Sequence, residues 1–261
     1  TKVLSQPNEI VSLCVSSDVD IVVAGMVGAA GLNYVFSSAK AGKRILLANK
    51  ESLVMAGALL MQTTRDYGAE IMPVDSEHNA IFQSLPDNYM PGMPRPHGVE
   101  SIILTASGGP FLDYPLKDFH AITPEQAMNH PKWSMGAKIS IDSATMMNKV
   151  LEVIEAHFLF SMPIEDIETV IHPQSLVHSM VRYSDGSVIA QMGEPDMRIP
   201  IMHALSWPHR SRSGASKVDF LACGNLVFDE MCVKRFPCFG FARECVEKGQ
   251  AAMIALNAAN E

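Results

Sequence analysis

The stretch Ala69-Glu70-Ile71-Met72-Pro73-Val74-Asp75-Ser76-Glu77-His78-Asn79-Ala80 decides the fold and marks a site. Its first four residues read as a short buried strand, and residues 80–85 look like the start of an apolar-faced helix. Asp75 and Glu77 are two residues apart where a strand ends, and in extended chain that spacing directs both carboxylates to one side. Like charges directed at one point repel unless a cation lies between them or one is protonated. The pattern predicts a site for a hard cation such as Mg²⁺ or Mn²⁺, with a solvated acidic turn as the alternative.

The residues before this stretch alternate strands with helices. Residues 20–24 and 44–48 are short apolar runs, typical of strands buried on both faces. The first run leads into a helix that ends near Gly42, and residues 51–67 form a second helix stopped by Gly68. This β-α-β-α-β order predicts a parallel sheet with helices on both faces, and therefore an α/β fold.

Glycines at positions 25, 28 and 31 follow the first strand, but their spacing differs from the Gly-x-Gly-x-x-Gly of a dinucleotide-binding turn. Close packing of strand on helix is the alternative to nucleotide contact. If this sheet is half of a doubly wound domain, we expect the phosphate-binding turn to precede residue 1.

Asn49, Lys50 and Glu51 follow the second strand, at the end of the sheet where ligands bind in such folds. A surface ion pair between Lys50 and Glu51 would explain the same spacing.

Residues 101–105 read as a strand that runs into Ser107-Gly108-Gly109-Pro110. A serine followed by two glycines leaves backbone N–H groups and a hydroxyl free to bind an anion, although an ordinary tight turn has the same composition. Residues 110–136 carry little apolar periodicity and end in His130-Pro131-Lys132-Trp133-Ser134-Met135-Gly136. A long connection of this kind is often a lid, with a core-packing Trp133 as the alternative.

A helix running to about Phe160 is expected to be capped by Asp142 or Ser143. Asn148, Lys149 and Glu152 interrupt its apolar positions and share one face. Polar groups beside apolar helix positions are costly to bury without partners, so their density with Ser143 favours a site over a solvated ion pair.

The later residues contain strands over 168–172, 176–183 and 188–192, with a hairpin signal at Asp185-Gly186. We expect this sheet to support the site without forming it, and His172 and His178 to be structural. Residues 207–233 read as a linker, and a helical segment begins near Phe236.

Composition excludes several classes of protein. Of the 261 residues, 48% are apolar and 18% charged, and the net charge of -8 without a Lys or Arg cluster argues against nucleic-acid binding. No apolar run reaches the length of a membrane span. Five cysteines without a Cys-x-x-Cys pair fit a reduced cytoplasmic setting and not a zinc site. The chain lacks an initiator Met and a targeting segment, and we expect it to be part of a longer protein.

Six motifs occur in order along the chain. They are Leu47-Ala48-Asn49-Lys50-Glu51-Ser52, Pro73-Val74-Asp75-Ser76-Glu77-His78-Asn79-Ala80, Ser107-Gly108-Gly109-Pro110-Phe111, His130-Pro131-Lys132-Trp133-Ser134-Met135-Gly136, Asp142-Ser143-Ala144-Thr145-Met146-Met147-Asn148-Lys149 and Ile171-His172-Pro173-Gln174-Ser175. From about Asp20 to Glu261 the sequence closely resembles the 1-deoxy-D-xylulose 5-phosphate reductoisomerase family of the non-mevalonate isoprenoid pathway.

The resemblance implies an NADPH- and divalent-metal-dependent enzyme, using Mg²⁺, Mn²⁺ or Co²⁺, that is a homodimer of cytoplasmic or plastid-type location. Such an enzyme rearranges 1-deoxy-D-xylulose 5-phosphate and reduces the resulting aldehyde to 2-C-methyl-D-erythritol 4-phosphate. The implied fold is an incomplete Rossmann-like parallel sheet, an α+β catalytic domain and the start of a C-terminal helical domain. The expected boundaries are 1–75 for the second half of the NADPH-binding domain, 76–206 for the catalytic domain, 207–233 for a linker and 234–261 for the helical domain.

The resemblance also implies roles for individual residues. Asp75, Glu77 and Glu152 match metal ligands, while Trp133 and Met135 match a loop that closes over substrate. Substrate contacts match Lys50, Ser76, Ser107, His130, Ser143, Asn148 and Lys149. Nucleotide contacts match Asn49, Glu51 and Gly136.

The chain also departs from the family pattern. Val150 stands where the family pattern has Gly, and we expect the N-terminal glycine-rich turn and the last C-terminal helices to lie outside this chain. Two other classes would use the same residues, a metal-dependent sugar-phosphate aldolase or isomerase without a nicotinamide step, and a non-enzymatic module that binds a sugar phosphate or a metal.

Overall fold

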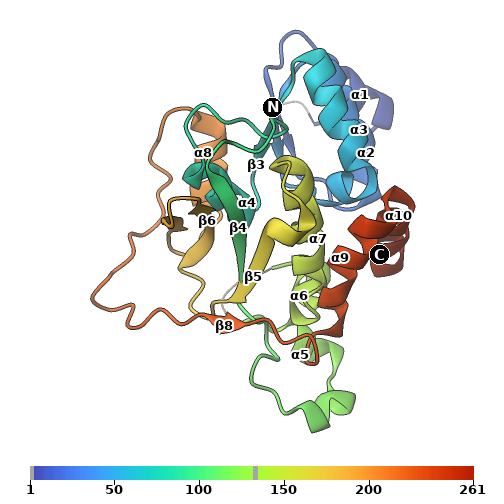
Figure 1. Cartoon of the computed structure of the whole chain (residues 1–261). Helices are drawn as coiled ribbons and strands as arrows, with labels where there is room; N and C mark the ends of the chain where they lie inside the picture. The colour runs from blue at the N-terminus through green and yellow to red at the C-terminus, as the bar shows by residue number, and fades with distance from the viewer. Residues whose placement is uncertain (1–2, 132–134) are drawn as a thin grey trace.

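The first layer of the molecule is a three-stranded parallel sheet with the order β1-β2-β3. The computed structural model describes residues 3–131 and 135–261. The elements of this layer are α1 (Pro7–Val15), β1 (Ile21–Ala24), η1 (Ala29–Gly31), α2 (Leu32–Lys40), β2 (Arg44–Leu47), α3 (Glu51–Tyr67) and β3 (Glu70–Pro73). The predicted β-α-β-α-β order and the α/β fold class are therefore confirmed (Figure 1).

Local sequence explains this layer. Ile45, Leu46 and Leu47 of the central strand β2 are fully buried, because helices cover both faces of the sheet. Helix α3 ends at Gly68, whose φ of 66° is a left-handed conformation that glycine adopts without steric strain.

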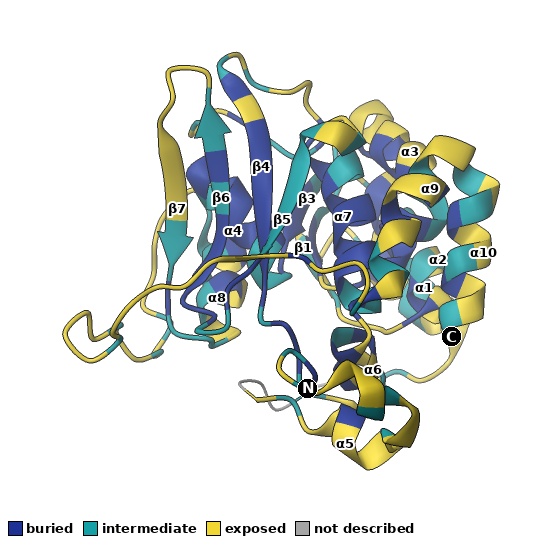
Figure 2. Cartoon of the chain, turned by 60° about the horizontal axis from the view of Figure 1, so that its bottom comes forward, coloured by how far each residue is buried: buried dark blue, intermediate teal, exposed yellow. Residues whose placement is uncertain are grey.

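The second sheet is mixed and has the order β7-β6-β4-β5-β8. Its strands are β4 (Val99–Ala106), β5 (Ile167–Ile171), β6 (Val177–Tyr183), β7 (Val188–Met192) and β8 (Asp229–Glu230). Strand β4 pairs with β5 in parallel and with β6 antiparallel. Figure 2 shows β4 buried near the centre of this sheet and β7 more exposed at its edge.

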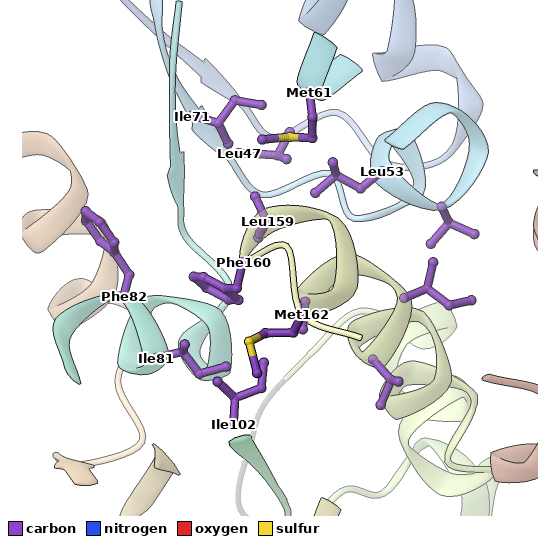
Figure 3. Close-up of a cluster of buried hydrophobic side chains, with 14 of the residues drawn as sticks. Leu47, Leu53, Met61, Ile71, Ile81, Phe82, Ile102, Leu159, Phe160 and Met162 are labelled. Atoms are coloured by element: carbon purple, nitrogen blue, oxygen red, sulfur yellow. The ribbon is translucent and has the colours of Figure 1, made fainter. Parts of the chain in front are cut away.

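The remaining elements connect and cover the two sheets. They are α4 (Ser76–Ser84), η2 (Leu116–Ala121), α5 (Pro124–Met128), α6 (Ala137–Ala144), α7 (Met147–Leu159), η3 (Ile164–Asp166), α8 (Arg198–Ser206), η4 (Pro237–Gly240), α9 (Phe241–Lys248) and α10 (Gln250–Asn260). One apolar core extends from the first sheet to the second: it includes Leu47 of β2, Ile81 of α4, Ile102 of β4 and Leu159 of α7 (Figure 3). This shared core holds α4 and α7 in place relative to both sheets.

The expected single helix from Asp142 or Ser143 to residue 160 is wrong. Both residues lie inside α6, and Met146, with a φ of 64°, separates α6 from α7. The left-handed turn places the Met146 side chain, 2% exposed, in a small apolar cluster that includes Ile171. Burial of this side chain against distant residues is a tertiary effect that local periodicity does not report.

The connection over residues 110–136 contains η2 and α5, which the lack of periodicity did not predict. Helix α5 begins with a capping box, in which Thr123 and Gln126 bond each other's backbone N–H, followed by Pro124 at the first helical position. These three residues form a helix-start signal from which the sequence alone could have predicted α5.

The C-terminal helices α9 and α10 pack beside α7 and α3 (Figure 1). Helix α3 is interrupted at Ala56, and the Gln250 side chain donates to the nearby carbonyls of Val54 and Met55 at 3.0 and 2.7 Å. The predicted helical segment near Phe236 is confirmed. Within residues 3–131 and 135–261, every helix is too short or too polar to cross a bilayer.

Candidate metal and substrate site

A cavity of about 270 Å³ lies where the two sheets meet α6 and α7. It is lined by these residues predicted from the sequence: Lys50, Asp75, Ser76, Glu77, Ser107, His130, Met135, Ser143, Asn148, Lys149 and Glu152. Side chains from β3–α4, the end of β4 and helix α7 thus face one space, although as many as 102 positions separate Lys50 from Glu152.

Three carboxylates converge in the cavity. One oxygen each from Asp75, Glu77 and Glu152 lies within 4.8 Å of the others. The expected extended geometry of Asp75 and Glu77 is wrong, because α4 begins at Ser76 and Glu77 lies in its first turn. Asp75 occupies the position before the helix, and the turn of the helix, not strand alternation, brings the two side chains together.

Two lysines neutralise part of this charge. The Lys50 ammonium lies 2.6 Å from Asp75 Oδ2 and 3.2 Å from Glu152 Oε1. The Lys149 ammonium lies 2.7 Å from Glu77 Oε1 and also contacts Glu152 Oε2. Burial alone would lower the pKa of both lysines, but the facing carboxylates outweigh it and raise both pKa values.

The carboxylates respond in opposite directions. Burial followed by repulsion from Glu152 raises the pKa of Glu77, whereas the Asp75 pKa is lowered because Lys50 and His78 outweigh burial. Three carboxylates facing two ammonium groups leave one excess negative charge. An all-oxygen carboxylate set with excess negative charge fits a hard divalent cation such as Mg²⁺ or Mn²⁺.

The turn after β4 contributes Ser107 to the lining of the cavity. Gly108 and Gly109 have φ values of 86° and 64°, and Gly109 N–H donates to Ser107 Oγ at 3.2 Å. Ser107 Oγ also lies 2.9 Å from His130 Nε2, and burial lowers the pKa of His130. A Cβ at Gly109 would lie 2.9 Å from the Ser143 carbonyl oxygen, so only glycine lets α6 approach this closely. Hydroxyls, an imidazole and a glycine turn gathered here are suited to a phosphate group.

The residues predicted to contact nucleotide lie outside this cavity. Asn49 lines a second cavity of about 650 Å³ along β1, and its amide donates to the Gly28 carbonyl at 3.0 Å. Glu51 is buried in the first turn of α3, and Gly136 is exposed before α6. A Cβ at Gly31 would lie 2.9 Å from the Asn49 amide nitrogen, which supports the packing interpretation for that glycine.

Among the further residues that line the cavity, and that sequence reasoning did not assign to it, are Ser175, Val177, His178 and Met197. Ser175, Val177 and His178 belong to or precede β6, and Met197 precedes α8. The expectation that this sheet only supports the site is therefore wrong at these positions. The motif that ends in Ser175 was the available signal. Met135 lines the cavity, whereas Trp133 lies outside the described residues.

Comparison with known proteins gives consistent matches along the chain. Family models match residues 1–57 (1-deoxy-D-xylulose 5-phosphate reductoisomerase), residues 71–160 (1-deoxy-D-xylulose 5-phosphate reductoisomerase C-terminal domain) and residues 192–261 (DXP reductoisomerase C-terminal domain). The 1-deoxy-D-xylulose 5-phosphate reductoisomerase of Pseudomonas paraeruginosa is 55% identical over the whole chain, which covers 66% of that relative. The enzyme of the same name from Shewanella frigidimarina is 54% identical over the whole chain, which covers 67% of it. The chain thus spans about two thirds of the length of the curated relatives it matches.

Solved structures agree with these matches. A crystal structure of DOX-P reductoisomerase in complex with NADPH, fosmidomycin and magnesium has a TM-score of 0.92 and 49% identity, covering 98% of this chain and 64% of that one. The 1-deoxy-D-xylulose 5-phosphate reductoisomerase from Zymomonas mobilis in complex with NADPH has a TM-score of 0.87 and 44% identity, covering 97% and 63%.

Proposed function

Because the chain belongs to the 1-deoxy-D-xylulose 5-phosphate reductoisomerase family, we propose that it carries the metal and substrate site of such an enzyme. The proposed reaction rearranges 1-deoxy-D-xylulose 5-phosphate and then reduces the resulting aldehyde with NADPH to 2-C-methyl-D-erythritol 4-phosphate. The observation that carries the proposal is one cavity lined both by the carboxylate triad and by Ser107 of the Ser-Gly-Gly turn.

Asp75, Glu77 and Glu152 would hold the divalent cation, with Mg²⁺, Mn²⁺ or Co²⁺ as candidates. When bound, the cation supplies Lewis-acid stabilisation of negative charge on the substrate oxygens. Lys50 Nζ donates to Asn148 Oδ1 at 2.7 Å, and this pair would orient the substrate beside the triad. The Ser76 hydroxyl donates to Glu77 Oε2 at 2.6 Å and would hold that carboxylate in place.

The phosphate end of the substrate would lie against the turn after β4. Ser107, His130 and Ser143 would contact the phosphate oxygens, and Asn148 and Lys149 would face it from α7. A phosphate fixed there positions the reacting carbons relative to the triad, which lowers the entropic cost of reaching the transition state.

NADPH binding, and closure of a loop over the substrate, would involve surfaces next to the cavity. We assign Asn49, Glu51 and Gly136 to NADPH contacts, since all three lie near the ends of α3 and α6. Trp133 and Met135 would close over the substrate and exclude water from the reacting groups.

A homodimer is the proposed assembly. The edge strand β7 exposes Val188 and Ile189, and the segment before β8 exposes Phe220 and Leu221, the last at 98%. Exposed apolar side chains on an edge strand are typical of a surface covered by a partner. We further propose a cytoplasmic location, in keeping with bacterial relatives and five free cysteines.

The proposed domain division follows the two sheets. Residues 1–75 would contribute to NADPH binding, 76–206 would form the catalytic domain, 207–233 would link them to the helical segment 234–261. Strand β8 lies within the linker and pairs with β5, so the proposed linker is anchored to the catalytic sheet.

The proposed site is tested by calorimetric binding of 1-deoxy-D-xylulose 5-phosphate with and without Mn²⁺. We expect binding that depends on Mn²⁺ and is lost in Glu152→Gln, because the substrate oxygens need the cation that Glu152 holds. Glu165→Gln is the matched control, since Glu165 is exposed in η3, away from the cavity.

Equal binding without Mn²⁺, or unchanged binding in Glu152→Gln, would contradict the metal assignment. Oxidation of NADPH on addition of the substrate separates the reductoisomerase from an aldolase or isomerase without a nicotinamide step.

A further inference from the structure

Behind the carboxylate triad lies a buried pair that the proposed chemistry does not use. His78 follows Asp75 by three positions on α4, and Glu155 follows Glu152 by three positions on α7. Residues three apart on a helix share a face, so Glu155 lies one turn beyond Glu152 on α7, and His78 lies in α4 one turn beyond Asp75, the residue before that helix. His78 Nδ1 lies 3.5 Å from Glu155 Oε2 and 3.9 Å from Asp75 Oδ2. Both His78 and Glu155 have no solvent exposure.

The hydrogen bond at the other ring nitrogen sets the direction of the ring. His78 Nε2 is 2.8 Å from the backbone carbonyl oxygen of Glu152, and a carbonyl only accepts, so Nε2 carries a hydrogen and donates. His78 Nδ1 then faces two carboxyl groups, of which Glu155 is the nearer at 3.5 Å.

The pair links the two elements that carry the triad. From α4, the His78 ring reaches the backbone of Glu152 on α7, and the same ring borders the Asp75 carboxylate. The ring is stacked on Phe160 with centroids 6.3 Å apart and planes at 13°, so it lies in a fixed orientation. Glu155 closes the remaining side of the ring.

We propose that Glu155 is a positioning residue that, through His78, fixes the separation and orientation of Asp75 and Glu152. The inference rests on the proposed metal site and adds to it a buried support that sets its affinity. Outer partners of metal ligands orient the ligands, and their loss weakens metal binding by about 10- to 100-fold.

Burial without good hydrogen bonds supports a positioning role over a stabilising one. Among the described residues, His78 Nδ1 and both Glu155 oxygens lack a hydrogen-bond partner at normal distance. Such groups are costly in an apolar interior, and apolar replacements of buried polar pairs are often neutral or stabilising. A pair that only stabilised the fold would have its buried polar atoms hydrogen-bonded at normal distances.

The test is calorimetric titration of the purified protein with Mn²⁺ alone, together with its thermal unfolding in the absence of metal. Glu155→Met removes the carboxyl group at similar volume, and we expect about 10- to 100-fold weaker Mn²⁺ binding with an unchanged or higher unfolding midpoint. In Glu155→Gln the amide N–H donates to His78 Nδ1, so we expect Mn²⁺ affinity within about threefold of the unmodified protein. Glu165→Gln is again the matched control.

Unchanged Mn²⁺ affinity in Glu155→Met would overturn the positioning role. It would also be overturned if Glu155→Met and Glu155→Gln lost the same Mn²⁺ affinity and the same unfolding midpoint as each other. That result is expected of a residue that only stabilises the fold. A stoichiometry of two Mn²⁺ would also overturn it, because Asp75, His78 and Glu155 would then be ligands themselves. Failure of the unmodified protein to bind Mn²⁺, or retained binding in Glu152→Gln, would instead reject the metal site on which the inference rests.

Discussion

Helix α7 packs against α3 with apolar groups, whereas its side chains towards α4 are buried charges. On the α3 side, Phe158 lies so close to Gly57 that no Cβ fits there, and Leu159 belongs to the main apolar core. On the α4 side, Lys149 pairs with Glu77, and the Glu152 carbonyl accepts from His78. One contact stabilises the fold through apolar burial, and the other keeps charges in place for a ligand.

The difference shows that one face of a helix can stabilise the fold while another face of the same helix carries the functional groups. Substitutions on the apolar face should change the free energy of unfolding without changing the site. Substitutions on the charged face should change stability in a way that depends on charge balance and on added metal.

The largest effect is expected on the apolar face. Leu159→Ala should lower the free energy of unfolding by about 4 kcal/mol, because Leu159 is fully buried and the truncation leaves a cavity. Urea denaturation measures this change. Mn²⁺ affinity of the folded variant should stay the same, and a loss of affinity would show that the two faces of α7 are coupled.

The next effect tests charge balance on the other face. Lys149→Met leaves three carboxylates facing one ammonium group, and we expect a loss of about 3 kcal/mol without metal. Added Mn²⁺ at about 100 times its dissociation constant should return about 2.7 kcal/mol, since it binds only the folded state.

Thermal unfolding of Lys149→Met with and without Mn²⁺ measures both changes. Lys248→Met is the control, because Lys248 forms an exposed pair with Glu244 one turn away and its unfolding midpoint should not move. At one fixed Mn²⁺ concentration, an equal gain in the unfolding midpoint of the unmodified protein and of Lys149→Met would contradict the charge-balance argument, because both would then bind Mn²⁺ equally well.

A smaller effect is expected where α3 touches α7. Gly57→Ala places a Cβ 2.2 Å from Phe158 Cδ2, so the ring must move. We expect a net loss of about 1–2 kcal/mol, because overpacking outweighs the higher helix propensity of alanine. Combining it with Phe158→Leu should recover part of the loss in chemical denaturation, and strict additivity of the two substitutions would argue against direct contact.

The smallest effect concerns the far side of α4, where His203 of α8 lies against Asn79. Burial, followed by repulsion from Arg210, lowers the pKa of His203 to about 4. A histidine whose pKa is lower in the folded than in the unfolded state binds fewer protons when folded, so stability is present above pH 6.5 and is lost as the pH falls towards 4. Because the ring is partly exposed, solvent screening reduces the loss to about 1 kcal/mol.

Equilibrium denaturation between pH 7 and pH 4 measures the effect of His203. In His203→Gln this part of the pH dependence should be absent, while the amide can still accept from Asn79, which lies 3.1 Å from His203 Nδ1. An identical pH profile in both proteins would contradict the assignment.

Sequence reasoning succeeded where the deciding interactions are local. Apolar runs such as Ile45-Leu46-Leu47, followed by helical periodicity, determined the parallel sheet and helix α3. The same reasoning identified the charged residues that line the cavity, because carboxylates, lysine and amide beside apolar positions are unusual wherever they occur. It was wrong where burial of one residue overrides local periodicity, as at Met146 between α6 and α7.

The tertiary structure alone decided which of these residues meet. Asp75 and Glu77 converge through the first turn of α4, and Glu152 joins them only because the shared apolar core holds α7 beside that turn. His178 reaches the same cavity from a strand that appeared to be mere support, and Glu155 lies opposite His78 with no sequence signal for the pair. The physical reason is the distance along the chain over which each signal acts. Hydrophobic periodicity is local and reports which face of each element is buried, whereas the packing of distant elements sets which polar groups those faces bring together.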